Sequence, residues 1–423
     1  IMWYGAARSR EDLFRGLRHL PFSKDLRQSW QYNNLMYLAA GHVLERVTGK
    51  TWEENVRERV TAPLGMGSVS FSARDALAGA DVATPYDQKE LDEGGREVRR
   101  VEFREIANVG PAGSINASAR DMGAWLAMLL NGGKGPGGEE VLPPEAVRDL
   151  LTPQMVMPMV RDPSEPEVIP TGYAMGWFTD AYRGRFRAHH GGNIDGFSAM
   201  MCVLPDQKIG VVVLVNMNAS PVPDLVMNHA LDRLLIPEGD GARRDWSGET
   251  FAKVQQARAL ARQGQKDRAL TRVEGTSPAH DIAAYAGEYE HPAYGVVTVT
   301  ESGGVLTLAW NGFALPLEHW HYDVFAMTKV EKAEMFEGQR VQFTTSMDGA
   351  VDSLRLAAEP TLAPATFAKR ADARLSDPAY LERVAGEYTL GPQVITVAVR
   401  GTTLTMSVPG QPTFDLVPTA GGG

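Results

Sequence analysis

The spacing of apolar residues changes from a helical to an alternating pattern near residue 170, and this change constrains the fold more than any other feature. Upstream of it, residues 33–48 repeat apolar side chains at helical spacing, and Gly49 is placed to end that helix. Thr51-Trp52-Glu53-Glu54 is typical of a capping box that opens a second helix, which has to end before Pro63. Ser118 begins a third helix, for which we predict a buried face of Met122, Trp125, Leu126, Leu129 and Leu130.

Downstream of residue 170 the chain reads as a meander of strands. Short apolar or alternating runs predict strands at 172–178, 185–190, 196–204 and 209–216. Pro205-Asp206-Gln207-Lys208 predicts the turn between the last two, and a helix is expected at about 221–235. Helices followed by antiparallel strands and another helix predict an α+β fold with helices packed on an antiparallel sheet.

The last third of the chain is a different kind of sequence. Residues 237–280 are predicted to be a linker and a charged helix, with the helix at 249–272. From about 283 onward the sequence predicts short strands separated by glycine-containing turns, at 287–290, 295–301, 305–309, 313–318, 322–328, 340–345 and 351–357. Seven or eight strands at this spacing predict that residues 281–370 form a small antiparallel barrel.

An internal repeat follows the predicted barrel. Tyr285-Ala286-Gly287-Glu288-Tyr289 returns as Val384-Ala385-Gly386-Glu387-Tyr388, an offset of 99 residues (387 − 288). Residues 378–423 are therefore expected to be a partial second barrel, with about half of the strands. Half a barrel leaves strand edges unpaired, so we expect it to pair with something else or to be part of a longer sequence.

Composition excludes several classes of function. The 423 residues are enough for two or three domains, and the net charge of 42 − 52 = −10 disfavours nucleic acid and anionic membranes as partners. No apolar run approaches the roughly 18 residues that span a bilayer. The single cysteine, Cys202, excludes an intrachain disulfide and is predicted to be buried in a strand. The sequence begins with Ile1 and ends inside the repeat, so we expect it to be cut at both ends.

Two short motifs point to a reaction. Tyr32-Asn33-Asn34 precedes the helix at 33–48, and His190-Gly191-Gly192 ends a predicted strand 158 positions later (190 − 32). With Pro63-Leu64-Gly65-Met66 after the next helix, they resemble the second and third motifs of the penicillin-recognising serine hydrolases. This superfamily includes class C β-lactamases, DD-peptidases, family VIII esterases and D-aminopeptidases. Class C β-lactamases have lysine where this chain has His190, whereas the esterases and D-aminopeptidases often have histidine or tryptophan.

The resemblance implies a hydrolase domain at 1–236 that lacks its N-terminal part, followed by lipocalin-like barrels. The family's first motif, Ser-x-x-Lys, carries the nucleophile and should precede Tyr32. None of Ser9, Ser23 and Ser29 has a lysine three positions on. We therefore expect the nucleophile to lie outside this chain, and the chain alone to be nearly inert. The resemblance also favours a periplasmic or secreted location.

In the mechanism that the resemblance implies, a serine attacks a carbonyl and forms an acyl-enzyme with a small ester, an amide or a D-residue peptide. Tyr32 protonates the leaving group, and His190 stands at the third motif's donor position. The implied substrate-binding residues are Asn34, Gly191, Gly192 and Asn193. The glycines let a substrate backbone approach the strand, and the Asn193 N–H forms half of the oxyanion hole.

Other interpretations remain open from the sequence. The chain could be a pseudo-hydrolase that binds a peptide or a glycan fragment without cleaving it, and an oligomer or a complementing N-terminal segment could be its partner. Tyr32 could be a surface tyrosine and Asn34 a helix cap. No cofactor is implied, and a metal is disfavoured because the adjacent His189 and His190 point to opposite faces of a strand. His319 and His321 share a predicted strand face, where a pair without function is the simpler interpretation.

Overall fold

The structure is a computed structural model and describes residues 2–90, 95–157, 161–239, 243–269, 271–359 and 362–418. The chain forms two compact units. The sheet unit consists of Arg8–Phe14 and Pro21–Lys266, and the barrel unit consists of Ile1–Ala7, Arg15–Leu20 and Asp267–Gly423. Each unit is described by itself. No helix in the described ranges is both long enough and apolar enough to cross a membrane.

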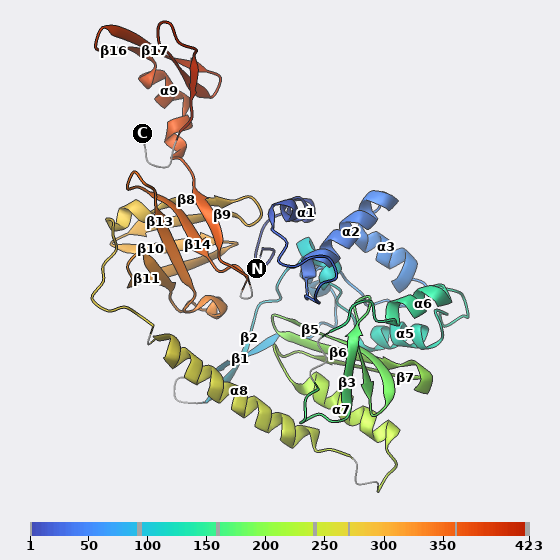
Figure 1. Cartoon of the computed structure of the whole chain (residues 1–423). Helices are drawn as coiled ribbons and strands as arrows, with labels where there is room; N and C mark the ends of the chain where they lie inside the picture. The colour runs from blue at the N-terminus through green and yellow to red at the C-terminus, as the bar shows by residue number, and fades with distance from the viewer. Residues whose placement is uncertain are drawn as a thin grey trace. The chain divides into compact units, whose positions relative to one another are not determined.

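The sheet unit is built on five antiparallel strands in the order β3-β4-β5-β6-β7 (Figure 1). Their bounds are Val168–Tyr173, Phe178–Tyr182, Arg185–Ile194, Phe197–Leu204 and Ile209–Val215. The prediction of a strand at 172–178 is wrong, because that stretch holds the turn from β3 to β4, where Gly176 takes a φ of 83°. The other three predicted strands are present, and the predicted α+β fold is confirmed.

Helices flank this sheet. Their bounds are α1 Arg10–Gly16, α2 Asn34–Thr48, α3 Trp52–Val56, α4 Ala73–Leu77, α5 Ala119–Leu130, α6 Pro144–Leu151, α7 Val222–Leu235 and α8 Trp246–Ala269. The predicted capping box at Thr51 and Glu54 is present, and Gly49 ends α2 with a φ of 70°. The unit also contains a hairpin of β1 (Tyr86–Glu90) and β2 (Arg96–Arg100). The linker predicted before α8 includes residues 240–242, which lie outside the described residues.

Two hydrophobic clusters bury the two faces of the sheet. On one face, Ala188 of β5 and Val203 of β6 pack with Leu126 and Leu129 of α5 and with α6. The opposite face contributes Cys202 and other residues that pack on α7 and the start of α8; these are Tyr182, Leu204, Met227, Leu231 and Trp246. Neighbouring residues on β6 alternate between the clusters, as the two-residue period of a strand requires. The sheet is therefore a rigid central layer, which fixes the positions of side chains at its ends.

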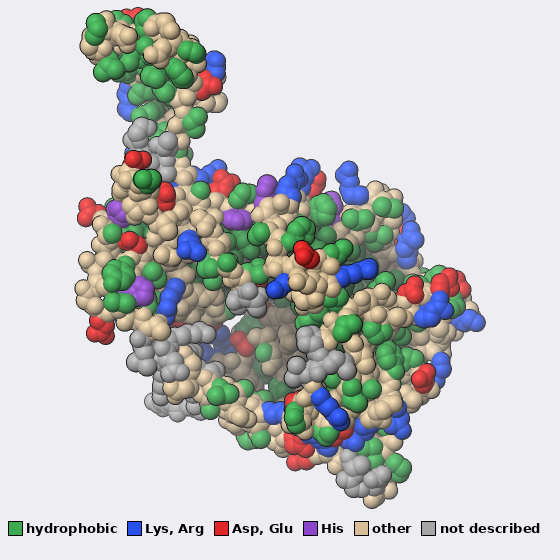
Figure 2. All heavy atoms as spheres, viewed as in Figure 1, with side chains coloured by type: hydrophobic (Ala, Val, Ile, Leu, Met, Phe, Trp, Pro, Cys, Tyr) green, Lys and Arg blue, Asp and Glu red, His purple; other side chains and the backbone are tan. Residues whose placement is uncertain are grey.

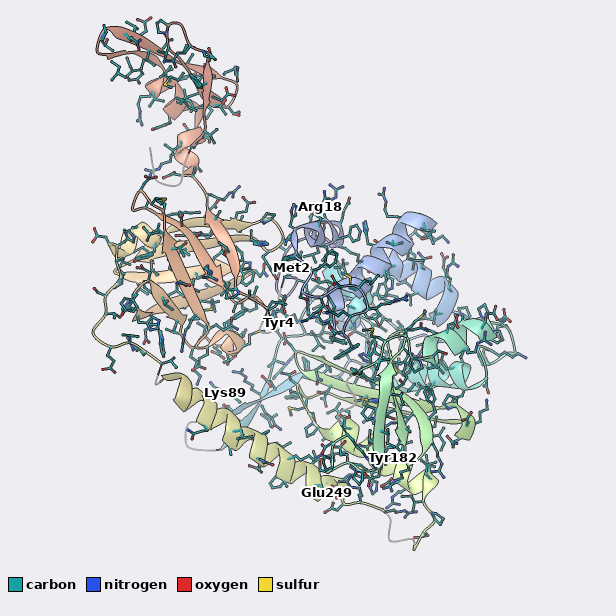
Figure 3. All side chains as sticks on the ribbon, in the orientation of Figure 1. Met2, Tyr4, Arg18, Lys89, Tyr182 and Glu249 are labelled. Atoms are coloured by element: carbon teal, nitrogen blue, oxygen red, sulfur yellow. The ribbon has the colours of Figure 1, made fainter. Side chains whose placement is uncertain are left out.

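The barrel unit contains the predicted eight-stranded barrel, closed in the order β8 to β15 with β15 paired to β8. The bounds are Gly287–His291, Gly295–Ser302, Val305–Trp310, Phe313–His321, Val324–Met327, Arg340–Thr345, Val351–Leu356 and Ala365–Lys369. At the N-terminus of the same unit, the Tyr4 ring stacks on Phe313 of β11 (Figure 3). A register shift between His319 and His321 breaks the regular strand, and each imidazole hydrogen-bonds a backbone group instead of facing a common ligand.

The repeat forms a separate four-stranded sheet in the order β16-β17-β18-β19, preceded by α9 (Pro378–Val384). These strands span Gly386–Leu390, Gln393–Arg400, Thr403–Ser407 and Phe414–Leu416. The predicted region extends to residue 423, and residues 419–423 lie outside the described part. Within the described residues this sheet is open, with β16 and β19 as its edges.

Candidate active site

Tyr32 and His190, 158 positions apart in the sequence (190 − 32), lie next to each other in the structure. Tyr32 immediately precedes α2, and His190 lies in the second half of β5. Their ring centroids are 6.0 Å apart, and the Tyr32 side chain is half-exposed. The two predicted catalytic side chains can therefore face the same small molecule.

The asparagines of the same motif have different roles. The side chain of Asn33 caps α2 by accepting a hydrogen bond from the Leu35 N–H at 2.9 Å. The alternative role for Asn34 as the cap is therefore wrong. Asn34 is the first residue of α2, it is half-buried, and its side chain makes no hydrogen bond within the described residues. Its amide is free to bind a ligand.

Aromatic residues that the sequence analysis did not single out complete the site. The Tyr173 hydroxyl lies 3.1 Å from Nε2 of His190, and the Tyr37 hydroxyl lies 3.4 Å from that of Tyr173. Trp30 packs against Tyr32 and Tyr173, with ring centroids 6.4 and 5.8 Å away. Tyr37 lies within the motif region that resembles the family. Tyr173, by contrast, carried no signal, because its neighbours predicted an ordinary strand.

The hydrogen bonds of His190 fix which of its nitrogens carries the proton. Nδ1 lies 2.6 Å from the carbonyl oxygen of Gly191, and because a carbonyl oxygen accepts, Nδ1 has to donate. Nε2 of the neutral ring then accepts a hydrogen bond from the Tyr173 hydroxyl. Burial lowers the pKa of His190 below its ordinary value, and the neighbouring His189 adds to this effect, against the hydrogen bond to Gly191. His190 is therefore a neutral imidazole at neutral pH.

Both tyrosines next to His190 keep their protons. Burial raises the pKa of Tyr32, and the nearby Tyr37 raises it further. The pKa of Tyr173 is raised more strongly, first by burial and then by its hydrogen bond to Tyr37. A protonated Tyr32 can donate a proton to a substrate atom, which is the role that a general acid requires.

The second half of β5 has an unpaired edge. β4 begins at Phe178, which pairs with His189, so among the described residues those from His190 to Ile194 pair with β6 alone. Gly192 and Asn193 are exposed there. An unpaired strand edge presents backbone N–H and C=O groups that an extended chain can pair with.

The two glycines of this edge face opposite sides of the sheet. A Cβ on Gly191 would lie 2.9 Å from Cε of Met200, whereas a Cβ on Gly192 would meet no atom within 4 Å. By strand alternation Gly192 shares a face with His190, so the open space beside it belongs to the site. Packing against Met200 of β6 therefore restricts the residue at position 191, whereas the space at position 192 would admit a side chain.

Asn193 is anchored through its side chain. Its Oδ1 accepts a hydrogen bond of 2.6 Å from the Ser198 hydroxyl, which is also 2.8 Å from the carbonyl oxygen of Met217 and accepts from Ser220 N–H. Arg104 forms an ion pair with Asp195 in the following turn. These contacts hold the backbone of Asn193 in place at the open edge.

A buried cluster of charged side chains lies on the face of β5 opposite to His190. Arg187 donates to both carboxylate oxygens of Asp180 at 3.0 and 2.6 Å, and Nε2 of His189 lies 3.2 Å from the same carboxylate. Burial alone would raise the pKa of Asp180, but the hydrogen bonds from His189 and Arg187 outweigh it and the pKa is lowered. Adjacent histidines thus have separate partners, and no group of three metal-binding side chains occurs in the described ranges.

Within the part of the chain that the structure describes, no serine hydroxyl hydrogen-bonds to the two motif side chains Tyr32 and His190. No serine in the sequence has a lysine three positions later. Ser9 bonds to Asp12 and Ser23 to Gln31. The described residues of the site thus provide a protonated phenol, an imidazole and an open strand edge.

Comparison with known families agrees with this geometry. Residues 2–235, more than half of the chain, match the family model described as Beta-lactamase. The chain belongs to the beta-lactamase family. The resemblance to the penicillin-recognising serine hydrolases is thereby confirmed. Residues 271–369, which include the barrel, match the model of a domain of unknown function (DUF3471).

Relatives of this beta-lactamase family chain include hydrolases. It is 29% identical over 301 residues to the unguisins hydrolase of Aspergillus violaceofuscus, covering 68% of this chain and 52% of that protein. It is 27% identical over 199 residues to protein flp of Staphylococcus aureus strain MW2, covering 47% of this chain and 36% of flp. The chain thus spans about half the length, or less, of these curated relatives.

Two solved structures align with this chain at low sequence identity and with TM-scores below 0.5. The octameric penicillin-binding protein homologue from Pyrococcus abyssi is 17% identical, with a TM-score of 0.44 and coverage of 87% of this chain and 77% of that chain. The D-amino acid amidase from Ochrobactrum anthropi SV3 in complex with L-phenylalanine amide is 21% identical, with a TM-score of 0.39 and coverage of 52% and 59%.

Proposed function

We propose that the sheet unit is the larger part of a serine hydrolase that transfers acyl groups from small esters, amides or D-residue peptides. The observation that carries the proposal is the meeting of Tyr32 and His190, 6.0 Å apart, at the open edge of β5. The nucleophile would come from a Ser-x-x-Lys segment outside these 423 residues. Membership of the beta-lactamase family and the unguisins hydrolase relatives support a hydrolase.

The chemistry assigns a role to each part of the site. The serine oxygen attacks the carbonyl carbon, its proton passes to the lysine, and the carbonyl electrons move to the oxygen. The N–H groups of Asn193 and of the serine bind that oxyanion. When the carbonyl re-forms, the bond to the leaving group breaks and Tyr32 supplies the leaving group's proton. Water then releases the acyl group from the serine by the same steps in reverse.

The surroundings suggest how a substrate is held. An extended acyl group can pair with the β5 edge at Gly192, and the Asn34 amide can donate to its polar groups. Trp30, Tyr32 and Tyr173 offer aromatic surface for an apolar side chain. His190, kept neutral by its burial, contributes a dipole in place of the positive charge that a lysine would bring.

An exposed apolar stripe on α2 supports a missing segment next to the site. Met36, Val43 and Val47 stay exposed, with Val47 at 79%, although they belong to the apolar stripe from which the helix was predicted. Apolar side chains at helical spacing usually pack on another element. A segment carrying Ser-x-x-Lys could cover this stripe and bring its serine to Tyr32.

The test compares the 423-residue chain with a chain extended by its native upstream coding sequence. The extended chain should give a burst of p-nitrophenol from a short-chain p-nitrophenyl ester, and a serine-reactive phosphonate should label the upstream serine. Tyr32→Phe in that chain should lower kcat by about 10²–10⁴, the range for a lost general acid. Tyr322→Phe, an exposed barrel tyrosine, is the matched control and should have no effect.

Two outcomes would contradict the proposal. One is hydrolysis by the 423-residue chain that scales with the amount of active protein, because the nucleophile would then lie within this chain. The other is an extended chain in which Tyr32→Phe keeps full kcat, because the acid would then be another group.

A second function, binding of a peptide or glycan fragment without cleavage, is favoured by the unpaired β5 edge, with which an extended ligand can pair. In that case the upstream sequence also lacks the motif. The 423-residue chain should then bind a fluorescent peptide ending in D-alanine, or a chitin trisaccharide, in a titration that Gly192→Ala weakens. Binding that Gly192→Ala leaves unchanged would show that the ligand lies elsewhere.

A further inference from the structure

A hollow of about 260 Å³ lies on the surface of the barrel unit, where the segment that precedes the first barrel strand meets the end of β11. Seven residues line it, and these are Arg272, Val273, Glu274, Gly275, Thr276, His319 and Trp320. Residues 272–275 are exposed, so a ligand can enter from solvent. All seven lie within 271–369, the part that matches the domain of unknown function. On the face of the barrel seen in Figure 2, acidic, basic and histidine side chains lie among hydrophobic ones.

Hydrogen bonds hold the two sides of the hollow together. Arg272 donates from Nε to the carbonyl oxygen of Trp320 at 2.9 Å, and from Nη2 to that of His319 at 2.8 Å. Further along, the Tyr322 N–H donates to Oγ1 of Thr276 at 3.1 Å. The hollow therefore has its shape before a ligand binds, which lowers the entropic cost of binding.

Trp320 forms an aromatic wall of the hollow. The guanidinium carbon of Arg340 lies 4.5 Å from the centroid of its ring, and that of Arg272 lies 5.5 Å away, so two cation–π contacts fix the ring. The Nε1–H of Trp320 is buried and has no hydrogen-bond acceptor within the described residues. Buried donors without an acceptor are uncommon in folded proteins, and an acceptor that a ligand carries into the hollow would satisfy this one.

A second aromatic side chain stands beside this wall. Tyr322 is 57% exposed, and its φ of 45° is a left-handed conformation that a bulky residue rarely adopts. Two residues of the hollow maintain it, because Nε2 of His319 donates to the Tyr322 carbonyl oxygen at 2.9 Å and Thr276 accepts its N–H. The ring of His321 lies between, with centroids 6.5 Å from Trp320 and 5.7 Å from Tyr322. Backbone strain of this kind concentrates at ligand sites.

The polar groups around the hollow include both donors and acceptors. Arg272 has further N–H groups besides the two that bind backbone carbonyls, and the Glu274 carboxylate makes no hydrogen bond or ion pair within the described residues. The charges of Arg272 and Arg340 are balanced by Glu274 and by Glu318, whose Oε1 lies 3.5 Å from Nη1 of Arg272. This balance favours a ligand without net charge. A hydroxyl group both donates and accepts, so a polyhydroxylated ring can bind guanidinium and carboxylate while its C–H face packs on an aromatic ring.

We propose that the hollow and the aromatic strip of Trp320, His321 and Tyr322 form a carbohydrate-binding site that takes a short chain of neutral sugars. One sugar ring occupies the hollow against Trp320, with its hydroxyl groups on Arg272 and Glu274. The next sugar packs on Tyr322. This site lies outside the hydrolase domain and gives the barrel a binding role of its own.

Titration of the 423-residue chain with uncharged oligosaccharides tests the proposal. Calorimetry with cellotriose, maltotriose and the chitin trisaccharide should show saturable binding of at least one of them. Glu274→Gln should weaken that binding about tenfold, because hydroxyl groups then lose a charged acceptor. Tyr322→Ala should also weaken it, whereas Tyr322→Phe keeps the ring and the affinity. Glu331→Gln, exposed and outside the hollow, is the matched control and should leave the affinity unchanged.

Gly192→Ala separates this site from the β5 edge, since it should leave sugar binding to the barrel unchanged. The carbohydrate site would be overturned if none of the three sugars bound, or if Glu274→Gln and Tyr322→Ala both kept the affinity of the wild type. Binding of free D-alanine in place of the sugars, lost in Glu274→Gln, would also overturn it. The opposite charges of Arg272 and Glu274 would then serve a zwitterion.

Discussion

Exchanging the two glycines of β5 for alanine separates a packing role from a substrate role within one strand. Gly191→Ala brings a methyl group 2.9 Å from Cε of Met200 and 3.3 Å from the carbonyl oxygen of Ala199. Overpacking costs typically about 1–3 kcal/mol, and the free end of Met200 can move, so we expect a loss of about 1 kcal/mol in unfolding free energy. Gly192→Ala meets no atom within 4 Å. It should stabilise by about 0.5 kcal/mol, because alanine restricts the unfolded chain.

The order of the two substitutions should reverse for activity: Gly192→Ala should lower it more than Gly191→Ala does. The methyl group of Gly192→Ala lies on the His190 face and separates the strand edge from the substrate backbone. Losing about two backbone hydrogen bonds at about 1 kcal/mol each lowers kcat/KM of the extended chain about 30-fold. Gly191→Ala faces α7 and should lower it about threefold at most, through a shift of Met200.

The stability measurement has to isolate the sheet unit from the barrel unit. Hydrogen exchange of peptides across 185–204, followed in increasing urea, reports the unfolding of β5 and β6. The kinetic assay uses the p-nitrophenyl ester and a D-residue peptide amide. The reasoning would be refuted if Gly191→Ala lost as much activity as Gly192→Ala while both kept the stability of the wild type. In that case the site would not lie on the His190 face.

Two further outcomes follow from the charges around β5. Asp180→Asn removes the carboxylate that pairs with the buried guanidinium of Arg187. In urea unfolding the sheet unit should lose about 3–5 kcal/mol of unfolding free energy, because Arg187 stays buried without its charged partner. A loss below about 1 kcal/mol would contradict this. Since the pKa of His190 is lowered in the folded state, the unfolded chain binds a proton at this side chain at a higher pH than the folded chain does. Stability should therefore be constant above an unfolded pKa of about 6.5 and fall as the pH drops from there toward the folded pKa. A His190→Gln variant should lose that part of the pH dependence, and a wild-type curve without it would contradict the neutral imidazole.

Local signals in the sequence predicted most of the helices and strands. Gly49 ended α2, Thr51 and Glu54 formed the capping box, and seven of the eight strands of the barrel began within two residues of their predicted starts, whereas β15 was not predicted. These features depend on interactions between residues that are close in sequence, which patterns record directly. The strand predicted at 172–178 failed because an apolar run with Trp177 buried in the core resembles a strand even when it forms a turn.

The site was predictable in part. The resemblance supplied Tyr32 and His190 but not Tyr173, whose hydroxyl lies 3.1 Å from Nε2 of His190. That contact depends on β3 and β5 lying on either side of β4, a tertiary arrangement that no local pattern contains. The same holds for Trp30, which the sequence places in a loop before α2 and the structure places against Tyr173.

The repeat shows where a pattern stops being informative. Tyr289 and Tyr388 stand in the same sequence context, the same register and the same hydrogen bond, yet one is fully buried and the other is half-exposed. Alternation in a strand determines which face a side chain is on, and nothing in it determines what lies against that face. In the closed barrel the covering strands follow in sequence, so the pattern and the partner come together. Within the described residues of β16–β19 the same alternation is present, and it marks the apolar face without showing what covers it.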